Sequence, residues 1–151
     1  MVFRSASSEA TKAFAGKVAR RIARLPLRGN RAQIITLAGN LGAGKTTFIQ
    51  GFAKGLGLRA RITSPTFVIM KRYTLKKGKY RNLFHLDAYR MGGMEDLLPL
   101  GMADILSDPH NIVLIEWAAN VKSPLLTGAH ALSFAHGVHE DERRIVARIT
   151  V

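Results

Sequence analysis

The sequence predicts one α/β domain in which a mixed, mainly parallel central sheet is flanked by helices. Short apolar runs suited to buried strands alternate with segments of helical periodicity. A glycine-rich loop stands between the first fully apolar run and a helix-like segment. The 151 residues match the size of one ordinary domain, and no stretch rich in proline, glycine or serine is long enough for a flexible linker. We therefore expect residues 1–151 to form a single domain.

The first element that the sequence predicts is an amphipathic helix. Ser7 and Ser8 are suitable N-caps, and Glu9 would lie in the first turn. Apolar residues then recur at helical spacing, at Phe14, Val18, Ile22 and Leu25. The other face of this helix is basic.

A strand, a glycine-rich loop and a second helix are expected next. Residues 26–31 break the first helix, and residues 33–38 form a short apolar run suited to a buried strand. The second helix should begin near Lys45, with Gly55 and Gly57 well placed to end it.

The middle of the chain predicts a hairpin followed by short helices. Residues 66–73 and 80–87 look like two strands joined by a lysine-rich turn. Residues 94–106 read as one or two short helices broken by Pro99 and Gly101.

The last part of the chain predicts three strands. Residues 111–115 form a strand that is apolar after Asn111 and is followed by Glu116, and residues 131–135 and 144–151 complete the set. In an α/β sheet of this kind, a ligand site is expected at the carboxyl ends of the strands.

The loop matches the pattern G-x-x-x-x-G-K-S/T through Gly39, Gly44, Lys45 and Thr46. Its glycines let backbone N–H groups point at phosphate oxygens, and the following helix offers its positive end to the same anion. Lys45 should bridge the β- and γ-phosphates, and Thr46 should supply a hydroxyl to magnesium. The pattern therefore predicts a P-loop NTPase fold with ATP and Mg²⁺ as ligands, the alternative being a glycine-rich turn without a ligand. The loop residues expected to contact the nucleotide are Asn40, Leu41, Gly42, Ala43, Gly44, Lys45, Thr46 and Thr47.

Two acidic residues are candidates for a metal-binding or catalytic role beside this loop. Asp87 is the only acid between the loop and residue 94, and Glu116 is the later acid that closes a strictly apolar strand. One should orient the magnesium shell, and the other should polarise the attacking water or couple the phosphate state to a moving segment. The alternative is a structural carboxylate, for instance Asp87 paired with Arg90. His85 would share a strand face with Asp87 and either orient it or be a packed histidine.

The net charge of +13 is distributed unevenly. Residues before Asp87 carry 18 of the 23 basic side chains and one acid, Glu9. This asymmetry favours a polyanionic partner, although a merely basic surface is the other interpretation.

Several site classes are excluded or disfavoured by composition. The absence of cysteine excludes disulfides, thiolate metal sites and a cysteine nucleophile. His136 and His139 beside the acidic residues 140–142 are interpreted as a polar hairpin loop and not as a metal site. No apolar run approaches the about 20 residues of a membrane span, so no membrane partner is expected and a cytoplasmic location is the default.

Four blocks of the sequence, in order and spacing, resemble the bacterial TsaE proteins, also called YjeE, which are ATPases needed to form threonylcarbamoyladenosine in tRNA. These blocks are residues 39–48, 64–67 leading to Tyr73, 85–90 and 115–117. The resemblance spans the chain from the first helix to the last strand. The family usually has Asp where Asn40 stands and Pro where Ala118 stands, and the side chain at neither position is assigned a phosphate or metal role.

The resemblance implies roles for further residues. Ser64 and Thr66 would belong to a switch segment that senses the nucleotide state, and Asp87 to a block that is required for activity. Glu116 looks like the Walker B acid, so that the metal ligands would be Thr46 and Glu116, and the catalytic set would be Lys45, Asp87 and Glu116. Trp117 would lie near the nucleotide, although a core tryptophan is the alternative, and Thr11 would lie at the adenine end.

The implied activity is a magnesium-dependent ATPase that is slow alone and works with the proteins TsaD and TsaB, with tRNA contacted indirectly or transiently. A small-molecule P-loop kinase and a nucleotide-gated binding module without turnover are the alternatives. The oligomeric state of the isolated chain stays open at this stage.

Overall fold

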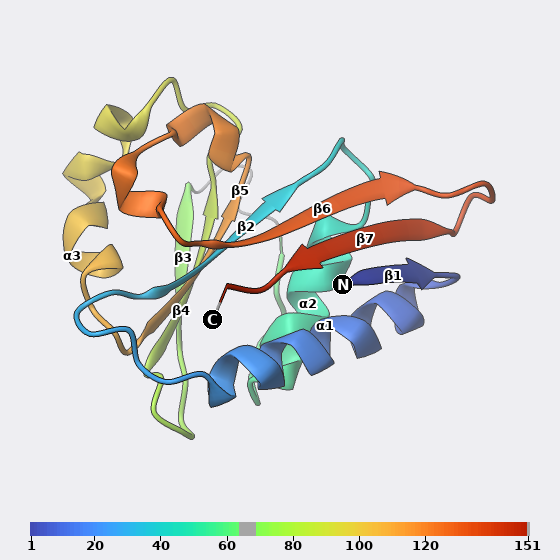
Figure 1. The fold of residues 1–151 in the computed structure, drawn as a ribbon, viewed down its shortest axis with the longest axis horizontal. Coiled ribbons are helices and arrows are strands. Elements are labelled where there is room, and N and C mark those ends of the chain that lie inside the picture. Colours follow the sequence, from blue (N-terminus) through green and yellow to red (C-terminus); the bar gives the residue numbers. More distant parts are fainter. Residues whose placement is uncertain (64–68, 151) are drawn as a thin grey trace.

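The structure is a computed structural model that describes residues 1–63 and 69–150. The described residues form a seven-stranded sheet with the strand order β1-β7-β6-β2-β5-β4-β3 (Figure 1). The strands are β1 Val2–Ser5, β2 Gln33–Ala38, β3 Met70–Thr74, β4 Asn82–Asp87, β5 Asn111–Glu116, β6 His130–His136 and β7 Arg143–Arg148. The α-helices are α1 Ser8–Arg24, α2 Lys45–Gly55 and α3 Met102–Leu106. Short 3₁₀ helices cover Met94–Asp96, Leu98–Leu100, Ala118–Val121 and Pro124–Leu126.

The sheet is parallel in its centre and antiparallel at both margins. β2 runs parallel to β5 and β6, and β5 runs parallel to β4. β3 pairs antiparallel with β4 at one margin, and β7 and β1 continue antiparallel beyond β6 at the other. The expected α/β fold with a mixed sheet is therefore confirmed, with its parallel pairings confined to the four central strands.

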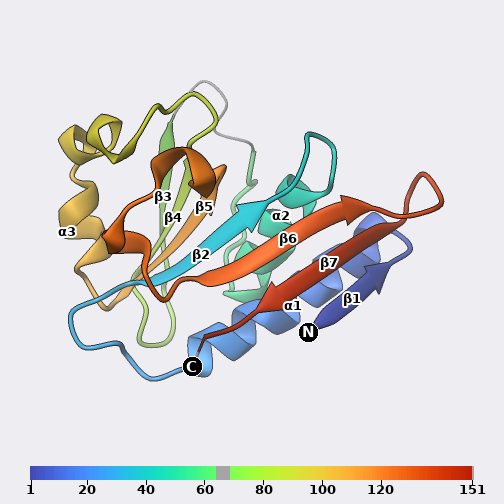
Figure 2. The ribbon, with the colours of Figure 1, turned by 45° about the horizontal axis from the view of Figure 1, so that its top comes forward.

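Both faces of the central strands are covered by helical segments (Figures 1 and 2). Ile35 of β2 and Leu114 of β5 pack into the core that α1 and α2 complete. Their neighbours Ile34 and Val113 point to the opposite face and pack with the segment that contains α3. Because both faces are buried, β2 and β5 are almost unbroken apolar runs instead of alternating ones.

Helix α1 forms as its sequence predicts and packs closely on α2. Ser7 is its N-cap, since the Ser7 Oγ accepts the N–H of Ala10 at 3.1 Å. A Cβ added at Gly51 of α2 would lie 2.5 Å from the Lys12 Cα, and one added at Gly55 would lie 2.7 Å from the Gly16 Cα. The two helices thus touch through their backbones. In the part of the chain that the structure describes, no helix has both the length and the apolar character needed to cross a membrane.

Several elements differ from the sequence-based expectation. The segment 94–106 contains three short helical pieces, and Pro99 lies inside the second of them instead of ending a helix. Strand β1, which pairs with β7, was not expected. The expected hairpin of β3 and β4 is confirmed, but β3 begins at Met70 and the start predicted for it at residue 66 lies outside the described residues.

Candidate functional site

The ends of β2, β4 and β5 meet at one edge of the sheet. Glu116, the last residue of β5, lies opposite Leu37 of β2 and opposite Asp87, the last residue of β4. The glycine-rich loop begins with Gly39, directly after β2. The fold therefore brings the loop and both candidate acids together at the carboxyl edge of the parallel strands.

The loop has a backbone that requires glycine at defined positions. Gly39 has a φ of 152°, and a Cβ there would lie 2.7 Å from the carbonyl oxygen of Phe134. Gly44 is left-handed, with a φ of 101°, and is the residue from which α2 starts. Between them Leu41 is 75% exposed, whereas Ala43 is buried in the core. The loop thus projects from the sheet edge while one of its side chains anchors it.

Lys45, the first residue of α2, is folded back onto the loop. Its Nζ donates to the carbonyls of Gly39 and Asn40, the second at 3.1 Å, and lies 4.9 Å from the centroid of the Trp117 ring. Burial lowers the pKa of Lys45, and the charges of Glu116 and Asp87 oppose this shift. The ammonium is therefore bonded to two loop carbonyls and lies within the electrostatic influence of two carboxylates.

Glu116 is held by a buried histidine. The Glu116 side chain is only 5% exposed, and its Oε2 lies 2.8 Å from the Nε2 of the fully buried His85. The Nδ1 of His85 has no hydrogen-bond partner among the described residues. His85 was expected either to orient Asp87 or to be a packed histidine. It is fully buried, and its side-chain hydrogen bond goes to Glu116 and not to Asp87.

Asp87 is more accessible than Glu116 and is engaged locally. Its Oδ1 accepts the backbone N–H of Tyr89 at 3.0 Å. Within the described residues it makes no ion pair with Arg90, so the alternative of a structural Asp87–Arg90 pair is not realised. The second carboxylate oxygen of Asp87 remains available toward the cavity that this residue lines.

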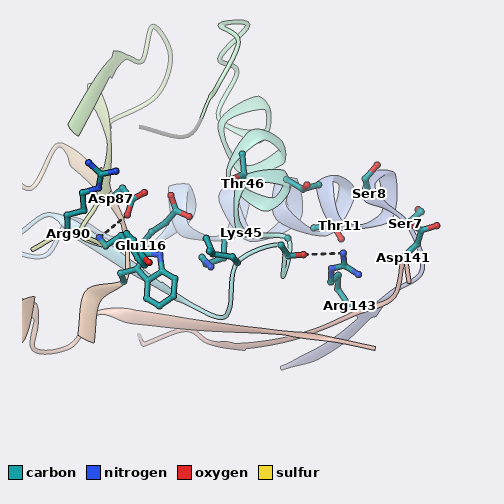
Figure 3. A pocket seen from close by; sticks show the side chains of 16 residues that line it. Ser7, Ser8, Thr11, Lys45, Thr46, Asp87, Arg90, Glu116, Asp141 and Arg143 are labelled. Carbon is teal, nitrogen blue, oxygen red and sulfur yellow. Dashed lines mark hydrogen bonds between the residues drawn. The ribbon is translucent and has the colours of Figure 1, made fainter. Parts of the chain in front are cut away.

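A cavity of about 430 Å³ joins these groups (Figure 3). Most of the site residues expected from the sequence line it, namely Thr11, Leu41, Gly42, Gly44, Lys45, Thr46, Thr47, Asp87, Glu116 and Trp117. Asn40 and Ala43 do not, since Asn40 offers its carbonyl to Lys45 and Ala43 packs in the core. Ser64 and Thr66, the expected switch residues, lie outside the described residues. Figure 3 shows Asp87 and Glu116 at one end of the row of labelled side chains and Ser7, Ser8 and Asp141 at the other.

Thr11 stands at the far end of the cavity and is almost fully buried. Its Oγ1 lies 2.7 Å from the Ser5 Oγ, which itself donates to the carbonyl of Ser7 at 2.7 Å. Because the Ser5 hydroxyl proton is used for Ser7, Thr11 is the donor in the Ser5–Thr11 bond. This hydrogen bond links the end of β1 to the first turns of α1. Because the hydroxyl proton of Thr11 is used in it, the Thr11 oxygen can only accept a hydrogen bond from a group in the cavity.

Trp117 follows Glu116 in a left-handed conformation, with a φ of 58°. It is half-buried, lines the cavity, and its ring meets that of Tyr89 edge-on with the centroids 5.1 Å apart. Non-glycine residues with positive φ are uncommon and cluster at functional sites. The structure thus places this side chain at the cavity wall beside Lys45, where it also packs against the core on the α3 side of the sheet.

Arg143 is a cavity residue that sequence reasoning missed. It begins β7, and its Nη1 donates to the carbonyls of Glu140 at 2.6 Å and Glu142 at 2.8 Å, while its Nη2 donates to the Gly42 carbonyl at 3.2 Å. The stem of Arg143 packs against Gly44. The available signal was the alternation in β7, which places Arg143 on the same face as the buried Ile145.

Ser7, Ser8, Tyr89, Arg90 and Asp141 also line the cavity without having been expected there as ligand contacts. The serines arrive from the start of α1, and Asp141 from the turn between β6 and β7. Only the tertiary packing of α1 and of this turn against the loop makes them neighbours.

The donor set suits a hard cation that keeps water in its shell. Thr46, Asp87 and Glu116 supply one hydroxyl and two carboxylates, which are the oxygen ligands that Mg²⁺ prefers. Across residues 1–63 and 69–150, no group of three His, Asp or Glu side chains forms a self-sufficient metal site. His139 and Glu142 form an exposed pair 3.9 Å apart in the turn between β6 and β7, as expected for a polar hairpin loop.

Comparison with known proteins identifies a family. Residues 5–146 match the family described as "Threonylcarbamoyl adenosine biosynthesis protein TsaE". A protein of Streptomyces coelicolor named tRNA threonylcarbamoyladenosine biosynthesis protein TsaE is 40% identical over 102 residues, which cover 67% of this chain and 65% of that protein. A protein of the same name from Bacillus subtilis is 41% identical over 92 residues, which cover 61% of this chain and 54% of that protein.

A solved structure is similar throughout. The crystal structure of Bacillus subtilis YdiB is 32% identical to the chain, with a TM-score of 0.70, and the match covers 100% of this chain and 86% of that one. The chain spans between about half and two thirds of the length of the curated relatives named above. Because the family match covers nearly the whole sequence, with the loop, Asp87 and Glu116 inside it, the chain belongs to the TsaE family.

Proposed function

We propose that this protein is the ATP-binding and ATP-hydrolysing subunit of the bacterial machinery that forms threonylcarbamoyladenosine in tRNA. The observation that carries the proposal is the meeting of the loop at residues 39–46 with Asp87 and Glu116 around one cavity. In this proposal the chain is a single-domain P-loop NTPase. The curated relatives, whose names place them in this biosynthesis, support the choice of pathway.

The cavity offers the volume and the loop backbone that a nucleoside triphosphate would need. Its volume of about 430 Å³ lies within the range of small-molecule sites, about 300–1,000 Å³. The backbone N–H groups of the loop and the start of α2 form an anion site. Lys45 would exchange its bonds to the carbonyls of Gly39 and Asn40 for bonds to phosphate oxygens. The ammonium charge would then offset the charge of the β- and γ-phosphates.

Magnesium would be held by Thr46 and Glu116 together with phosphate and water oxygens. When bound, the ion would neutralise charge that develops on the phosphoryl oxygens. The hydrogen bond from His85 fixes the Glu116 carboxylate at the strand end. In many metal sites a partner of this kind orients a ligand side chain, which makes His85 a positioning residue in this proposal.

Asp87 would place the attacking water. Its carboxylate follows β4 beside that of Glu116 and reaches the cavity from the solvent side. Water would attack the γ-phosphorus, and the bond from this phosphorus to the bridging β–γ oxygen would break. ADP would leave with the bond electrons, and the proton lost by the water would end on the released inorganic phosphate or in solvent. Little covalent chemistry is asked of the protein, so positioning by the loop, Lys45 and Asp87 carries the reaction.

The protein would act with TsaD and TsaB. Hydrolysis would be slow for the isolated chain and faster in the complex, with tRNA reached indirectly or transiently. Ser64 and Thr66, which stand between α2 and β3 in the sequence, would report the loss of the γ-phosphate to these partners. The proposed location is the cytoplasm, where tRNA and ATP are found.

A small-molecule kinase is the second candidate, and one observation favours it. Arg90 lines the cavity beside Asp87 and is not ion-paired to it, so it could hold an anionic acceptor. A kinase would turn over ATP only in the presence of that acceptor. A nucleotide-gated binding module would bind ATP and release it unchanged.

The deciding experiment is ATP hydrolysis by the purified chain with magnesium, alone and with TsaD and TsaB from the same organism, with and without tRNA. We expect slow release of phosphate alone, strong stimulation by the two proteins together, and loss of turnover when EDTA removes the metal. Nucleotide binding without stimulation by TsaD and TsaB would overturn the proposal in favour of one of the two alternatives.

A further inference from the structure

Six basic side chains gather at the end of the molecule remote from the cavity. The name basic end patch is used here for Lys17, Arg20, Arg21 and Arg24 of α1 together with Lys76 and Lys77 of the β3–β4 turn, all of them exposed. Figures 1 and 2 both place the end of α1 beside this turn. The Tyr80 hydroxyl, just after the turn, donates to the carbonyl of Leu25 at 3.3 Å and ties the two segments together.

The charge of the basic end patch is not neutralised within the described part of the protein. The ion pairs found there are His85–Glu116 and His139–Glu142, and neither contains a lysine or an arginine. Between residues 10 and 86 the sequence has no acidic residue. The patch is therefore a concentrated positive surface.

The spacing of the basic residues on α1 places like charges close together, which lowers the stability of the helix in the free protein. Lys17 and Arg21 are four residues apart, as are Arg20 and Arg24, so each pair shares a helix face. Like charges at this spacing destabilise a helix, and a bound polyanion removes that cost. The four side chains also line one surface groove with Leu25 and Pro26.

The chemistry of the patch fits the backbone of RNA. We propose that the basic end patch binds RNA phosphates, and the choice of RNA rests on the role in tRNA modification proposed above. Lysine and arginine side chains bind phosphates with release of counterions and without reading bases. A membrane surface fits less well, because the apolar face of α1, with Phe14, Val18 and Ile22, is already buried in the core and cannot insert into lipid.

The patch is separated from the cavity along α1. The start of α1 carries Ser7, Ser8 and Thr11, which line the cavity, while the patch occupies its second half. A helix of 17 residues is about 25 Å long at 1.5 Å per residue. The cavity and the patch therefore lie toward opposite ends of α1.

The test is binding of a fluorescently labelled, unmodified tRNA transcript, followed by anisotropy at several salt concentrations without ATP or partner proteins. The informative variant is the double substitution Lys17→Glu and Arg20→Glu. It reverses two charges and places each new glutamate four residues before Arg21 or Arg24, an arrangement that supports the helix. The matched control is Arg144→Glu with Arg148→Glu, which changes the net charge equally on exposed positions of β7.

We expect at least tenfold weaker tRNA binding and a flatter salt dependence for the α1 variant, with less than threefold weakening for the control. Equal weakening by both variants would show a response to net charge alone and overturn the proposal. Absence of tRNA binding by the wild-type protein would also overturn the proposal. The same holds if the wild type and the control bind vesicles of anionic phospholipid and the α1 variant does not. Binding of a fluorescent ATP analogue should be unchanged in both variants, so a failure of the ATPase proposal would be seen separately.

Discussion

His85 and Glu116 form a buried hydrogen bond of 2.8 Å between neighbouring parallel strands, near the carboxyl ends of both. The bond restrains a carboxylate that lines the cavity together with Lys45, Thr46 and Asp87. It is the hydrogen bond that the Glu116 side chain makes among the described residues, so it sets the direction in which this carboxylate points.

The first prediction concerns this bond. His85→Ala should lower the free energy of unfolding by about 2–4 kcal/mol, since it opens a cavity and removes the partner of a buried carboxylate. It should also lower ATP turnover more than nucleotide binding. Urea unfolding and steady-state hydrolysis measure the two effects. His85→Gln, which can still donate to Glu116, should recover part of the turnover, and failure to recover any would argue against a positioning role.

The second prediction separates binding from chemistry. Lys45→Ala should abolish productive nucleotide binding, because the phosphates lose their buried cation. Glu116→Ala should leave binding of a fluorescent ATP analogue largely intact and lower the turnover by about 100-fold or more. Lys54→Ala, at an exposed position of the same helix as Lys45, is the control and should behave as the wild type. Normal turnover in either site variant would refute the site assignment.

The third prediction tests Arg143. Its guanidinium links the Gly42 carbonyl of the loop to two carbonyls of the β6–β7 turn, so Arg143→Ala should loosen the loop. Nucleotide binding should weaken about tenfold, equivalent to about 1.4 kcal/mol. Arg143→Lys keeps the charge but cannot span three carbonyls and should restore little of the affinity. Arg144→Ala, the exposed neighbour, serves as the control, and an equal loss there would remove the case for Arg143.

The fourth prediction is a pH dependence of stability that originates at His130. Burial lowers the pKa of His130 to about 4, with a further contribution from the charge of Arg28. The imidazole donates from Nε2 to Gln33 Oε1 at 2.9 Å, and its Nδ1 accepts the N–H of Thr150 at 3.0 Å, so a second proton on Nδ1 would displace this bond. Because the unfolded chain takes up this proton more readily, stability should be complete above pH 6.5 and fall as the pH drops toward 4.

The loss at the acidic end of this window should amount to about 3 kcal/mol, at about 1.4 kcal/mol per pH unit. Urea unfolding between pH 4 and pH 7 measures it. His130→Gln should remove this part of the pH dependence, whereas His136→Gln, at an exposed position of β6, should keep it. A slope that survives in His130→Gln would assign the effect to another group.

Much of the fold follows from local patterns. β2 and β5 are largely apolar runs, of which β2 leads directly into the glycine-rich loop and β5 ends at Glu116. The N-cap and the apolar spacing of α1 can both be recognised in the sequence. These features depend on neighbouring residues, so sequence reasoning can find them. The same holds for the meeting of the loop with Asp87 and Glu116, because parallel strands end at one edge.

Other features depend on contacts between distant segments. β1 is only four residues long and is stabilised as a strand by its pairing with β7 at the other end of the chain. Arg143 reaches the loop because the β6–β7 hairpin passes over it, and the partner of His85 lies on a different strand. Periodic patterns in the sequence describe neighbouring residues only, so they do not show which distant segments come into contact.

The close approach of α1 and α2 has a mechanical consequence. At Gly51 and Gly55 the two helices touch with no side chain between them, so α2 has no slack in which to slide past α1. A displacement of α2 at its loop end should therefore move α1 with it as one rigid unit. The second half of α1 carries the lysine and arginine residues of the basic end patch.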